Sequence, residues 1–299
     1  MSHLTEQPVH EVAIVGAGPI GLELAVALQQ RKVSFAHFEA KQIGHTVTWW
    51  APQTRWFSSN ERISIAGVPL ITPDQSKATR EQYLAYLRAV VTQFDLPVRT
   101  FEPVTNIVRR SDGTFDITTL PRKGTTHTRA RRIVLCTGGT DRPRKLNIPG
   151  EDTAHVSSYF QDPHLYFRQR VMIIGGRNSA VEAALRCHHA GAKVILSYRQ
   201  GGLPEKSIKY WLMPEITGLM QTGKIEAHFN TQPVEIGPDF VTLEKLRDGQ
   251  PVRRFDVPCD FVLKLIGYEQ DHALLKLAGI ELSGPDRAPS STRRRWRRM

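Results

Sequence analysis

Residues 11–39 are the part of this sequence that most constrains its fold. An apolar run as long as a buried strand leads directly into three glycines at G-x-G-x-x-G spacing, Gly16, Gly18 and Gly21. Apolar residues at helical intervals follow, and a second apolar run ends on the acid Glu39. This order of strand, glycine turn, helix, strand and acid is the context that a dinucleotide-binding fingerprint requires.

Each part of the fingerprint has a physical role. The first glycine permits a tight turn, the second lets the backbone approach a pyrophosphate, and the third lets the helix pack close to the strand. The helix N-terminus offers free N–H groups to the phosphates, and an acid after the second strand accepts hydrogen bonds from a ribose. The alternative is a glycine-rich turn in an ordinary β–α unit. We predict that a cofactor is bound by Gly16, Gly18, Pro19, Gly21 and Glu39.

Length and composition indicate a globular chain with room for two domains. It has 299 residues, of which 40% are hydrophobic and 23% are charged. No uncharged apolar segment reaches about 18 residues, so we expect no transmembrane helix. Residues 1–10 are polar and do not resemble a signal peptide.

The cysteines and the charge limit the possible functions further. Cys136, Cys187 and Cys259 are widely spaced and form no C-x-x-C, which argues against a disulfide framework and favours a reducing cytoplasm. The formal charge of +11 could indicate nucleic acid or a membrane surface. Much of that charge comes from five arginines within residues 290–299. The remaining positive balance suits an enzyme that handles anionic cofactors.

The segment after Glu39 is rich in Trp, Thr and Ser. We predict that Lys41 and Thr46 contact the first cofactor. The tryptophans either line a ring pocket or form a satellite hydrophobic cluster under a long loop. A helix is predicted from Thr79, a capping-type residue, to Phe94.

Three alternating runs at residues 104–109, 114–119 and 126–135 predict a small antiparallel meander. The third run passes directly into Cys136, Thr137 and Gly138. This return of the chain could bring Thr137 and Gly138 beside the first cofactor.

A second strand–helix–strand unit begins at residue 170, with glycines in the pattern G-G-x-x-S-A. Its predicted cofactor residues are Gly175, Gly176, Asn178 and Ser179. The strand after this helix ends on Tyr198-Arg199 instead of an acid. An arginine there suits the 2′-phosphate of NADP, so Arg199 favours NADPH over NADH. The alternative is a solvated charge at a strand end.

Strands are then predicted at residues 226–230, 240–247 and 256–266. The order as a whole predicts an α/β fold with two Rossmann-like dinucleotide-binding domains, three-layered (ββα), each with an antiparallel β-meander insertion. We predict an FAD-binding domain over residues 1–150 and 265–289, an NADPH-binding domain over 151–264, and a disordered basic tail over 290–299.

Several segments of the sequence resemble one family more specifically. They are residues 57–69, 173–184, 198–199 and 207–215, and Gly267-Tyr268 with Asp271-His272. They are similar to the FAD- and NADPH-dependent bacillithiol-disulfide reductases (YpdA-like flavoproteins), which are related to thioredoxin-reductase-type enzymes.

The resemblance implies that FAD lies on the first domain and NADPH on the second. It also implies that hydride passes from NADPH to FAD and then to a low-molecular-weight disulfide, in a cytoplasmic enzyme of thiol redox homeostasis. We expect a homo-oligomer, no metal site, no membrane partner and no nucleic acid.

The sequence departs from this family in two places. Many members carry a cysteine inside the first glycine motif, where this chain has Ile20. Cys136 has no partner cysteine, and it fits a buried small apolar residue better than a nucleophile. No side chain is therefore assigned as catalytic; His155, His188, His189 and His272 are candidates by residue type only.

The second departure is the C-terminal segment. In the family a last strand and a glycine-rich turn close over the flavin, whereas residues 290–299 hold no glycine and no periodicity. We interpret this end as truncated or frame-shifted, which predicts weak FAD binding.

Two other functions remain open. A flavin monooxygenase has both fingerprints and a further signature before the second one. This chain does not match that signature, because the spacing between Gly150 and His155 differs by one residue and Ile148 stands in place of the leading Phe. A catalytically impaired nucleotide-binding protein, or a nucleic-acid-binding protein with an arginine tail, is the other alternative.

Overall fold

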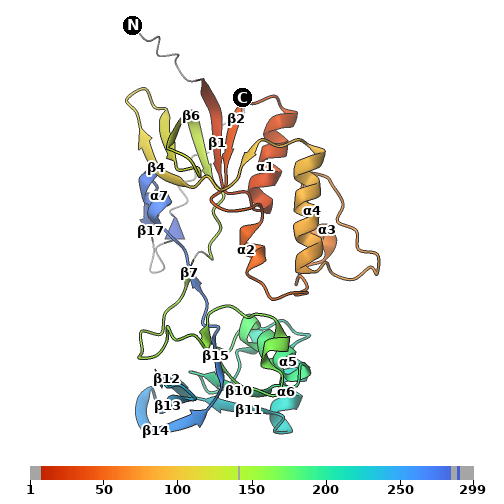
Figure 1. The fold of residues 1–299 in the computed structure, drawn as a ribbon, viewed down its shortest axis with the longest axis vertical. Helices are drawn as coiled ribbons and strands as arrows, with labels where there is room; N and C mark the ends of the chain where they lie inside the picture. Colours follow the sequence, from red (N-terminus) through yellow and green to blue (C-terminus); the bar gives the residue numbers. More distant parts are fainter. Residues whose placement is uncertain (1–7, 141, 284–287, 290–299) are drawn as a thin grey trace. The chain divides into compact units, whose positions relative to one another are not determined.

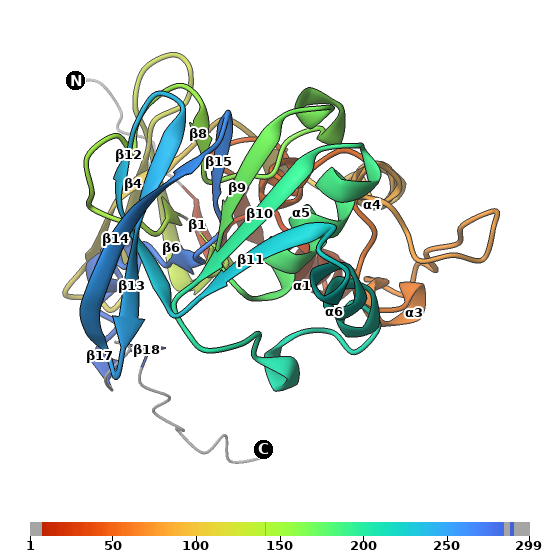
Figure 2. The same cartoon turned by 90° about the horizontal axis from the view of Figure 1, so that it is seen from below.

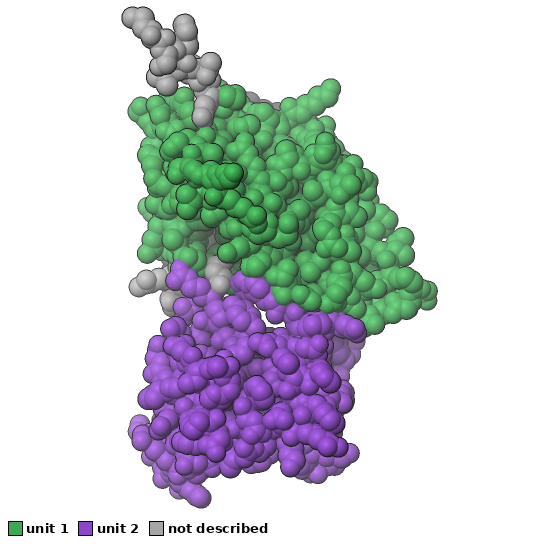
Figure 3. Space-filling view, in the orientation of Figure 1, with its two compact units in different colours: residues 1–48, 55–141, 270–299 green, residues 49–54, 142–269 purple. Residues whose placement is uncertain are grey.

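The computed structural model describes residues 8–140, 142–283 and 288–289. The chain forms two compact units, coloured green and purple in Figure 3. Unit 1 comprises residues 1–48, 55–141 and 270–299, and unit 2 comprises residues 49–54 and 142–269. The basic tail predicted over residues 290–299 lies outside the described residues. No described helix is long and apolar enough to cross a bilayer.

Unit 1 is built on a six-stranded sheet in the order β3-β2-β1-β6-β5-β4. Its parallel strands are β1 (Val9–Val15), β2 (Phe35–Phe38), β3 (Val98–Arg99) and β6 (Thr126–Leu135). Antiparallel pairing of β6 with β5 (Phe115–Thr119), and of β5 with β4 (Val104–Arg109), extends the sheet. The predicted meander is confirmed, and it is continuous with the parallel sheet because β6 belongs to both.

The main helices of unit 1, α1 and α4, lie side by side next to this sheet (Figure 1). Its helices are α1 (Pro19–Gln30), α2 (His45–Thr48), α3 (Asn60–Ile63), α4 (Arg80–Gln93) and α7 (Ala273–Leu277). The predicted start of α4 is confirmed by a capping box, in which the Gln82 backbone donates to Thr79 Oγ1 and the Thr79 backbone donates to Gln82 Oε1. The short strands β17 (Leu282–Ser283) and β18 (Ala288–Pro289) pair antiparallel.

Unit 2 has a five-stranded sheet, parallel throughout, in the order β11-β10-β9-β15-β8. Its strands are β8 (Val156–Ser157), β9 (Arg170–Ile174), β10 (Lys193–Tyr198), β11 (Ile225–Phe229) and β15 (Phe261–Lys264). The helices α5 (Asn178–His189) and α6 (Met213–Gln221) cover one face (Figure 2). An antiparallel sheet of β12 (Thr231–Ile236), β13 (Phe240–Arg247) and β14 (Gln250–Pro258) covers the other.

Alternation along β9 explains these three layers. Val171 and Ile173 are buried in a cluster with α5 and α6, while Met172 and Ile174 are buried in a cluster with β13. Because side chains of a strand alternate between faces, one apolar run supplies the core on both sides. The predicted α/β fold with two Rossmann-like domains in three layers is therefore confirmed. Short 3₁₀ helices (Pro163–Tyr166 and Glu205–Ser207) complete the unit.

One strand prediction is wrong. Residues 256–266 were expected to form a single strand, but β14 ends at Pro258 and β15 begins at Phe261, in a different sheet. The chain turns at Asp260, whose carboxylate accepts hydrogen bonds from the Arg170 backbone (2.7 Å) and from the Arg170 guanidinium (2.6 Å). These contacts between residues far apart in sequence interrupt an otherwise continuous apolar pattern.

The compact units also differ from the predicted domain limits, which placed all of residues 1–150 together. Residues 49–54 belong to unit 2, because Arg186 donates to Thr54 Oγ1 and to the Pro52 carbonyl, each at 2.6 Å. Residues 142–150 also belong to unit 2, where β7 (Arg142–Pro143) pairs with β16 (Tyr268–Glu269).

A buried ion pair in unit 2 generates a prediction for stability. Lys264 Nζ lies 3.3 Å from Glu151 Oε2, and each side chain is 6% exposed. Burial opposes ionisation of Glu151, but the Leu146 N–H and the Lys264 charge outweigh it and hold the pKa of this carboxyl below its usual value. Removing one partner of such a pair leaves an uncompensated buried charge.

We expect Glu151→Gln to lower the free energy of unfolding by about 3 kcal/mol, measured by urea denaturation at neutral pH. Asp152→Asn is the matched control, because its pair with Lys145 is exposed and 3.9 Å long, and it should cost less than about 0.5 kcal/mol. Equal effects of the two substitutions would contradict this account of Glu151.

A buried histidine in unit 1 generates a second prediction. His37 of β2 is fully buried; its Nε2 lies 3.0 Å from the Gly16 carbonyl oxygen, and its Nδ1 has no hydrogen-bond partner. Desolvation lowers the pKa of this ring below 6.5. As the pH falls through about 6.5, the unfolded chain gains a proton here before the folded protein does, so acid decreases the stability of the fold.

We expect the free energy of unfolding to fall more steeply from about pH 7 to about pH 5 in the wild type than in His37→Gln. The exposed His127 provides the control, because His127→Gln should keep the wild-type pH dependence. An unchanged pH dependence in folded His37→Gln would overturn the prediction.

Candidate functional site

The first glycine turn joins the ends of three strands. Gly16 has φ +106°, and its N–H donates to the Phe38 carbonyl at the end of β2 (2.7 Å). The backbone of Cys136, at the end of β6, donates to the Val15 carbonyl (2.7 Å). A Cβ atom at Gly16 would lie 2.5 Å from the Cys136 carbonyl oxygen. Only glycine fits this position, because both the positive φ and the close approach exclude a side chain.

The rest of the turn is shaped to receive a ligand against its backbone. A Cβ at Gly21 would lie 2.0 Å from the Gly16 carbonyl oxygen, so α1 packs directly on the turn. A Cβ at Gly18 would meet nothing within 4 Å, which leaves the backbone open on that side. Helix α1 begins at Pro19 without a side-chain cap, unlike α4. Uncapped N–H groups at a helix start are suited to bind phosphate.

Glu39 is fixed at the edge of this turn. One of its carboxylate oxygens accepts a hydrogen bond from the Ala17 backbone (2.7 Å), and the other accepts one from the Lys41 backbone (2.8 Å). The carboxylate therefore lies beside the glycine turn, at the end of β2. In this type of fold, an acid at this position binds the ribose hydroxyls. These residues fit the adenosine and pyrophosphate of a dinucleotide.

The other predicted residues of unit 1 lie on segments near the same end of the sheet. Thr46 is exposed on α2, and the preceding Gly44 N–H donates to the Ala17 carbonyl (3.0 Å). Thr137 and Gly138 directly follow the end of β6, and the Gly138 carbonyl accepts a hydrogen bond from the Gln270 side chain (3.1 Å). No contact of these residues with a cofactor is tested, so their role stays a prediction.

The second glycine turn repeats the geometry of the first with different residues. Gly175 has φ +145°, and its N–H donates to the Ser197 carbonyl on β10 (3.0 Å). A Cβ at Gly175 would lie 2.4 Å from the Leu265 carbonyl oxygen, just after β15. Gly176 packs against the Tyr198 ring, which a Cβ would approach to 2.5 Å. The residues fit a second dinucleotide for the same reasons as in unit 1.

Asn178 has a role that its place in the motif did not reveal. Its side-chain amide donates to the Ser207 carbonyl (3.0 Å) and accepts from the Lys209 backbone (2.8 Å). These bonds tie residues 207–209 to the start of α5, which has no side-chain cap. Ser179 is exposed in the first turn of that helix, and Arg199 is exposed immediately after β10. The spacing of the glycines does not predict hydrogen bonds between this helix and a loop that lies 29 to 31 residues later in the sequence.

The cysteines are not activated as nucleophiles. Burial raises the pKa of Cys136, and it raises the pKa of Cys187 to about 12 and that of Cys259 to about 11. All three therefore remain thiols at neutral pH, whereas thiolate is the reactive form. The bacillithiol-disulfide reductases often have a cysteine inside the first glycine motif. This chain has Ile20 at that position, and its side chain is 70% exposed.

Two of the histidine candidates have structural partners. His155 Nε2 lies 3.1 Å from the Gly237 carbonyl oxygen, and His189 Nε2 lies 2.7 Å from Glu215 Oε1. His188 packs beside His189, and His272 precedes α7. None of these contacts assigns a proton donor.

Two of the tryptophans in the segment after Glu39 lie in separate aromatic clusters. Trp56 lies 4.4 Å from the Tyr83 ring of α4, which fits a satellite hydrophobic cluster. Trp49 packs in unit 2 against Tyr159 and Tyr268, with ring centroids 5.4 and 6.3 Å away. Since Tyr159 follows β8 and Tyr268 follows β15, this cluster stands near the carboxyl end of the parallel sheet. No local sequence pattern indicates that these three rings meet.

Comparison with known proteins agrees with this arrangement. The pattern of the pyridine nucleotide-disulphide oxidoreductases matches residues 13–294. The bacilliredoxin reductase Bdr of Bacillus subtilis (strain 168) is 33% identical over 269 residues, which cover 90% of this chain and 80% of that protein.

Solved structures show the same relationship. Bacillithiol disulfide reductase Bdr (YpdA) from Bacillus cereus superposes with a TM-score of 0.87 at 33% identity, covering 95% of this chain and 86% of that one. A flavin-containing monooxygenase from Stenotrophomonas maltophilia has a TM-score of 0.71 at 21% identity, covering 95% and 85%, and this likeness concerns the fold alone. The chain belongs to the pyridine nucleotide-disulphide oxidoreductase family, as a flavoprotein oxidoreductase that uses FAD and NAD(P)H.

Proposed function

We propose that this protein is an NADPH-dependent flavoprotein reductase of low-molecular-weight disulfides, with bacillithiol disulfide as the leading substrate. The observation that carries the proposal is the 33% identity over 90% of the chain with bacilliredoxin reductase Bdr. The repeated glycine turns at Gly16 and Gly175 support it, because a reductase of this kind needs two dinucleotide sites. Thiol cysteines favour the cytoplasm as its location.

The two units would divide the cofactors between them. In unit 1, FAD would be held at the uncapped start of α1 and beside the carboxylate of Glu39. In unit 2, NADPH would be held at the start of α5, with Arg199 next to its 2′-phosphate. When bound, the two cofactors supply the hydride-transfer chemistry, and the protein supplies position and electrostatics. Assembly into a homo-oligomer stays a prediction.

The chemistry of the cysteines restricts how the disulfide is reduced. Each turnover consumes one NADPH and one proton, breaks one S–S bond, and releases two thiols. No cysteine presents a thiolate under neutral conditions, since burial raises the pKa of Cys136, Cys187 and Cys259. We therefore propose that reduction proceeds without a mixed disulfide between enzyme and substrate.

The first experiment combines absorbance spectroscopy with a coupled thiol assay. We expect the purified protein to have a visible flavin band that NADPH bleaches under nitrogen roughly tenfold faster than NADH, because only NADPH has a 2′-phosphate for Arg199. Addition of bacillithiol disulfide should restore the band and release two thiols per NADPH. Glutathione disulfide and cystine test selectivity among small disulfides.

Other outcomes of this experiment would contradict the proposal. NADPH oxidation that requires oxygen and yields an oxygenated product would favour a flavin monooxygenase. A colourless protein that takes up no added FAD would favour a catalytically impaired nucleotide-binding protein.

Substitution of Cys136 tests the absence of an enzyme thiol. We expect Cys136→Ser to keep disulfide-reductase activity within about twofold of wild type, because desolvation raises the pKa of this half-buried thiol and keeps it protonated. The flavin spectrum of the variant controls for loss of FAD. A loss of more than about tenfold in disulfide reduction, with FAD content and NADPH-driven bleaching unchanged, would assign Cys136 to the reaction.

A further inference from the structure

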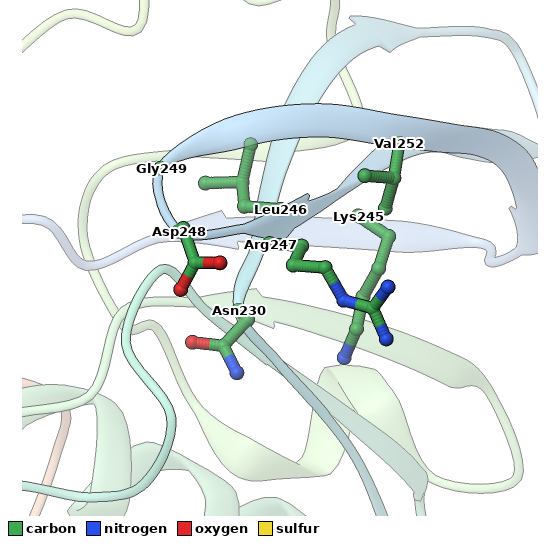
Figure 4. Close-up of a pocket in the computed structure, with 7 residues that line it drawn as sticks. All are labelled: Asn230, Lys245, Leu246, Arg247, Asp248, Gly249 and Val252. Carbon is green, nitrogen blue, oxygen red and sulfur yellow. The ribbon is translucent and has the colours of Figure 1, made fainter.

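We propose that a cleft at the end of the β13–β14 hairpin binds the 2′-phosphate end of NADPH, and that Arg247 contributes, together with Arg199, to selectivity for the phosphorylated cofactor. The inference rests on the proposed NADPH site of unit 2 and adds residues that the glycine motif does not contain. The cleft has a volume of about 560 Å³. Asn230, Lys245, Arg247, Asp248 and Val252 are among the residues that line it (Figure 4).

The hairpin geometry places both cations in the cleft. Lys245 and Arg247 are two residues apart on β13, so their side chains leave the same face of the strand. Figure 4 shows both extending to the same side of the ribbon. The register shifts after Lys245, which leaves Val252 of β14 without a cross-strand partner beside the cleft. The tight turn is completed by Asp248 (φ 51°) and Gly249 (φ 78°).

Hydrogen bonds attach this hairpin to the carboxyl ends of two parallel strands. Lys245 Nζ donates to the carbonyl of Phe229, the last residue of β11 (2.7 Å). The Asn230 N–H donates to the carbonyl of Gln200, two residues beyond the end of β10 (2.9 Å). The Leu246 N–H donates to the Asn230 carbonyl (2.7 Å). The cleft therefore borders the segment that contains Arg199.

Strand order places the cleft on the adenosine side of the site. The pyrophosphate is expected at the turn between β9 and α5, and the adenosine ribose at the end of β10. In the sheet, β11 lies beyond β10 and away from β9 and β15. An adenosine that extends past the end of β10 is thus directed toward the end of β11, where Asn230 and the hairpin stand.

The charges of the cleft suit a phosphate better than a hydroxyl. Lys245 and Arg247 contribute two positive charges, and Asp248 contributes one negative charge. A guanidinium binds phosphate oxygens through paired N–H donors. Lys245 already donates to the Phe229 carbonyl, so its position is fixed. The exposed Arg247 is therefore the side chain that we expect to bind the phosphate oxygens.

Binding of adenosine 2′,5′-bisphosphate and of 5′-AMP to the full-length holoprotein tests this inference by calorimetry. We expect Arg247→Gln to weaken bisphosphate binding by roughly tenfold and to leave 5′-AMP binding unchanged. Asp248→Asn should strengthen bisphosphate binding, because it removes the one negative charge while keeping a residue that tolerates positive φ.

Arg254→Gln is the matched control on the same hairpin. Arg254 pairs with Glu244 in the register of β13 and β14, so it lies on the face opposite Lys245. If only the overall positive charge of the hairpin mattered, Arg254→Gln and Arg247→Gln would weaken the binding of the bisphosphate equally. That result would overturn the proposal. Equal weakening of both ligands by Arg247→Gln would also overturn it.

The binding assay separates this inference from the proposed function. A wild-type protein that binds the two nucleotides equally would overturn both the NADPH preference and the role of Arg247. The thiol assay involves the disulfide and can fail while the calorimetric differences remain, in which case the inference stands and only the substrate assignment is lost.

Discussion

The close approach of backbone to backbone at the two glycine turns is the constraint on which both units depend. At Gly16, one peptide is held by the Phe38 carbonyl on one side and lies against the Cys136 carbonyl on the other. At Gly175, the Ser197 and Leu265 carbonyls have the same two positions. Each turn therefore fixes three parallel strands and the start of a helix with respect to one another. A single Cβ added at Gly16 or Gly175 would lie within 2.5 Å of a carbonyl oxygen on the neighbouring segment and would force these strands apart.

This constraint explains why the core of each unit could be predicted from sequence. The strand, the glycine spacing, the helix and the following strand are consecutive, so local patterns contain them completely. Residues 11–39 and 170–199 were interpreted correctly as β–α–β units. The Thr79 capping box was predictable for the same reason, since all its contacts fall within four residues.

Sequence reasoning was wrong about one strand, and elsewhere incomplete, where contacts between distant residues determine the structure. The apolar run over residues 256–266 reads as one strand until Arg170, ninety positions away, binds Asp260. Residues 49–54 lie within the first domain by sequence, but Arg186 holds them in unit 2. The Asn178 bonds to residues 207–209 and the triangle of Trp49, Tyr159 and Tyr268 have the same origin. Such contacts leave no periodicity in a single sequence.

The difference between the two units lies in the charge that follows the second strand. In unit 1 the strand ends on Glu39, whose carboxylate is immobilised by the Ala17 and Lys41 backbones and faces the turn as an acceptor. In unit 2 the equivalent strand leads to the exposed Arg199, and the carbonyl of the next residue, Gln200, accepts a hydrogen bond from the Asn230 N–H. A fixed acceptor suits a ribose diol, whereas exposed guanidinium groups suit a charged phosphate. Under the proposed assignment, nearly the same backbone turn holds two different dinucleotides, and side chains beyond the turn would determine the selectivity. Arg199 directly follows the β9–α5–β10 segment, whereas Arg247 comes from a later hairpin of the same unit, which the hydrogen bond of Lys245 to the Phe229 carbonyl holds at the end of β11.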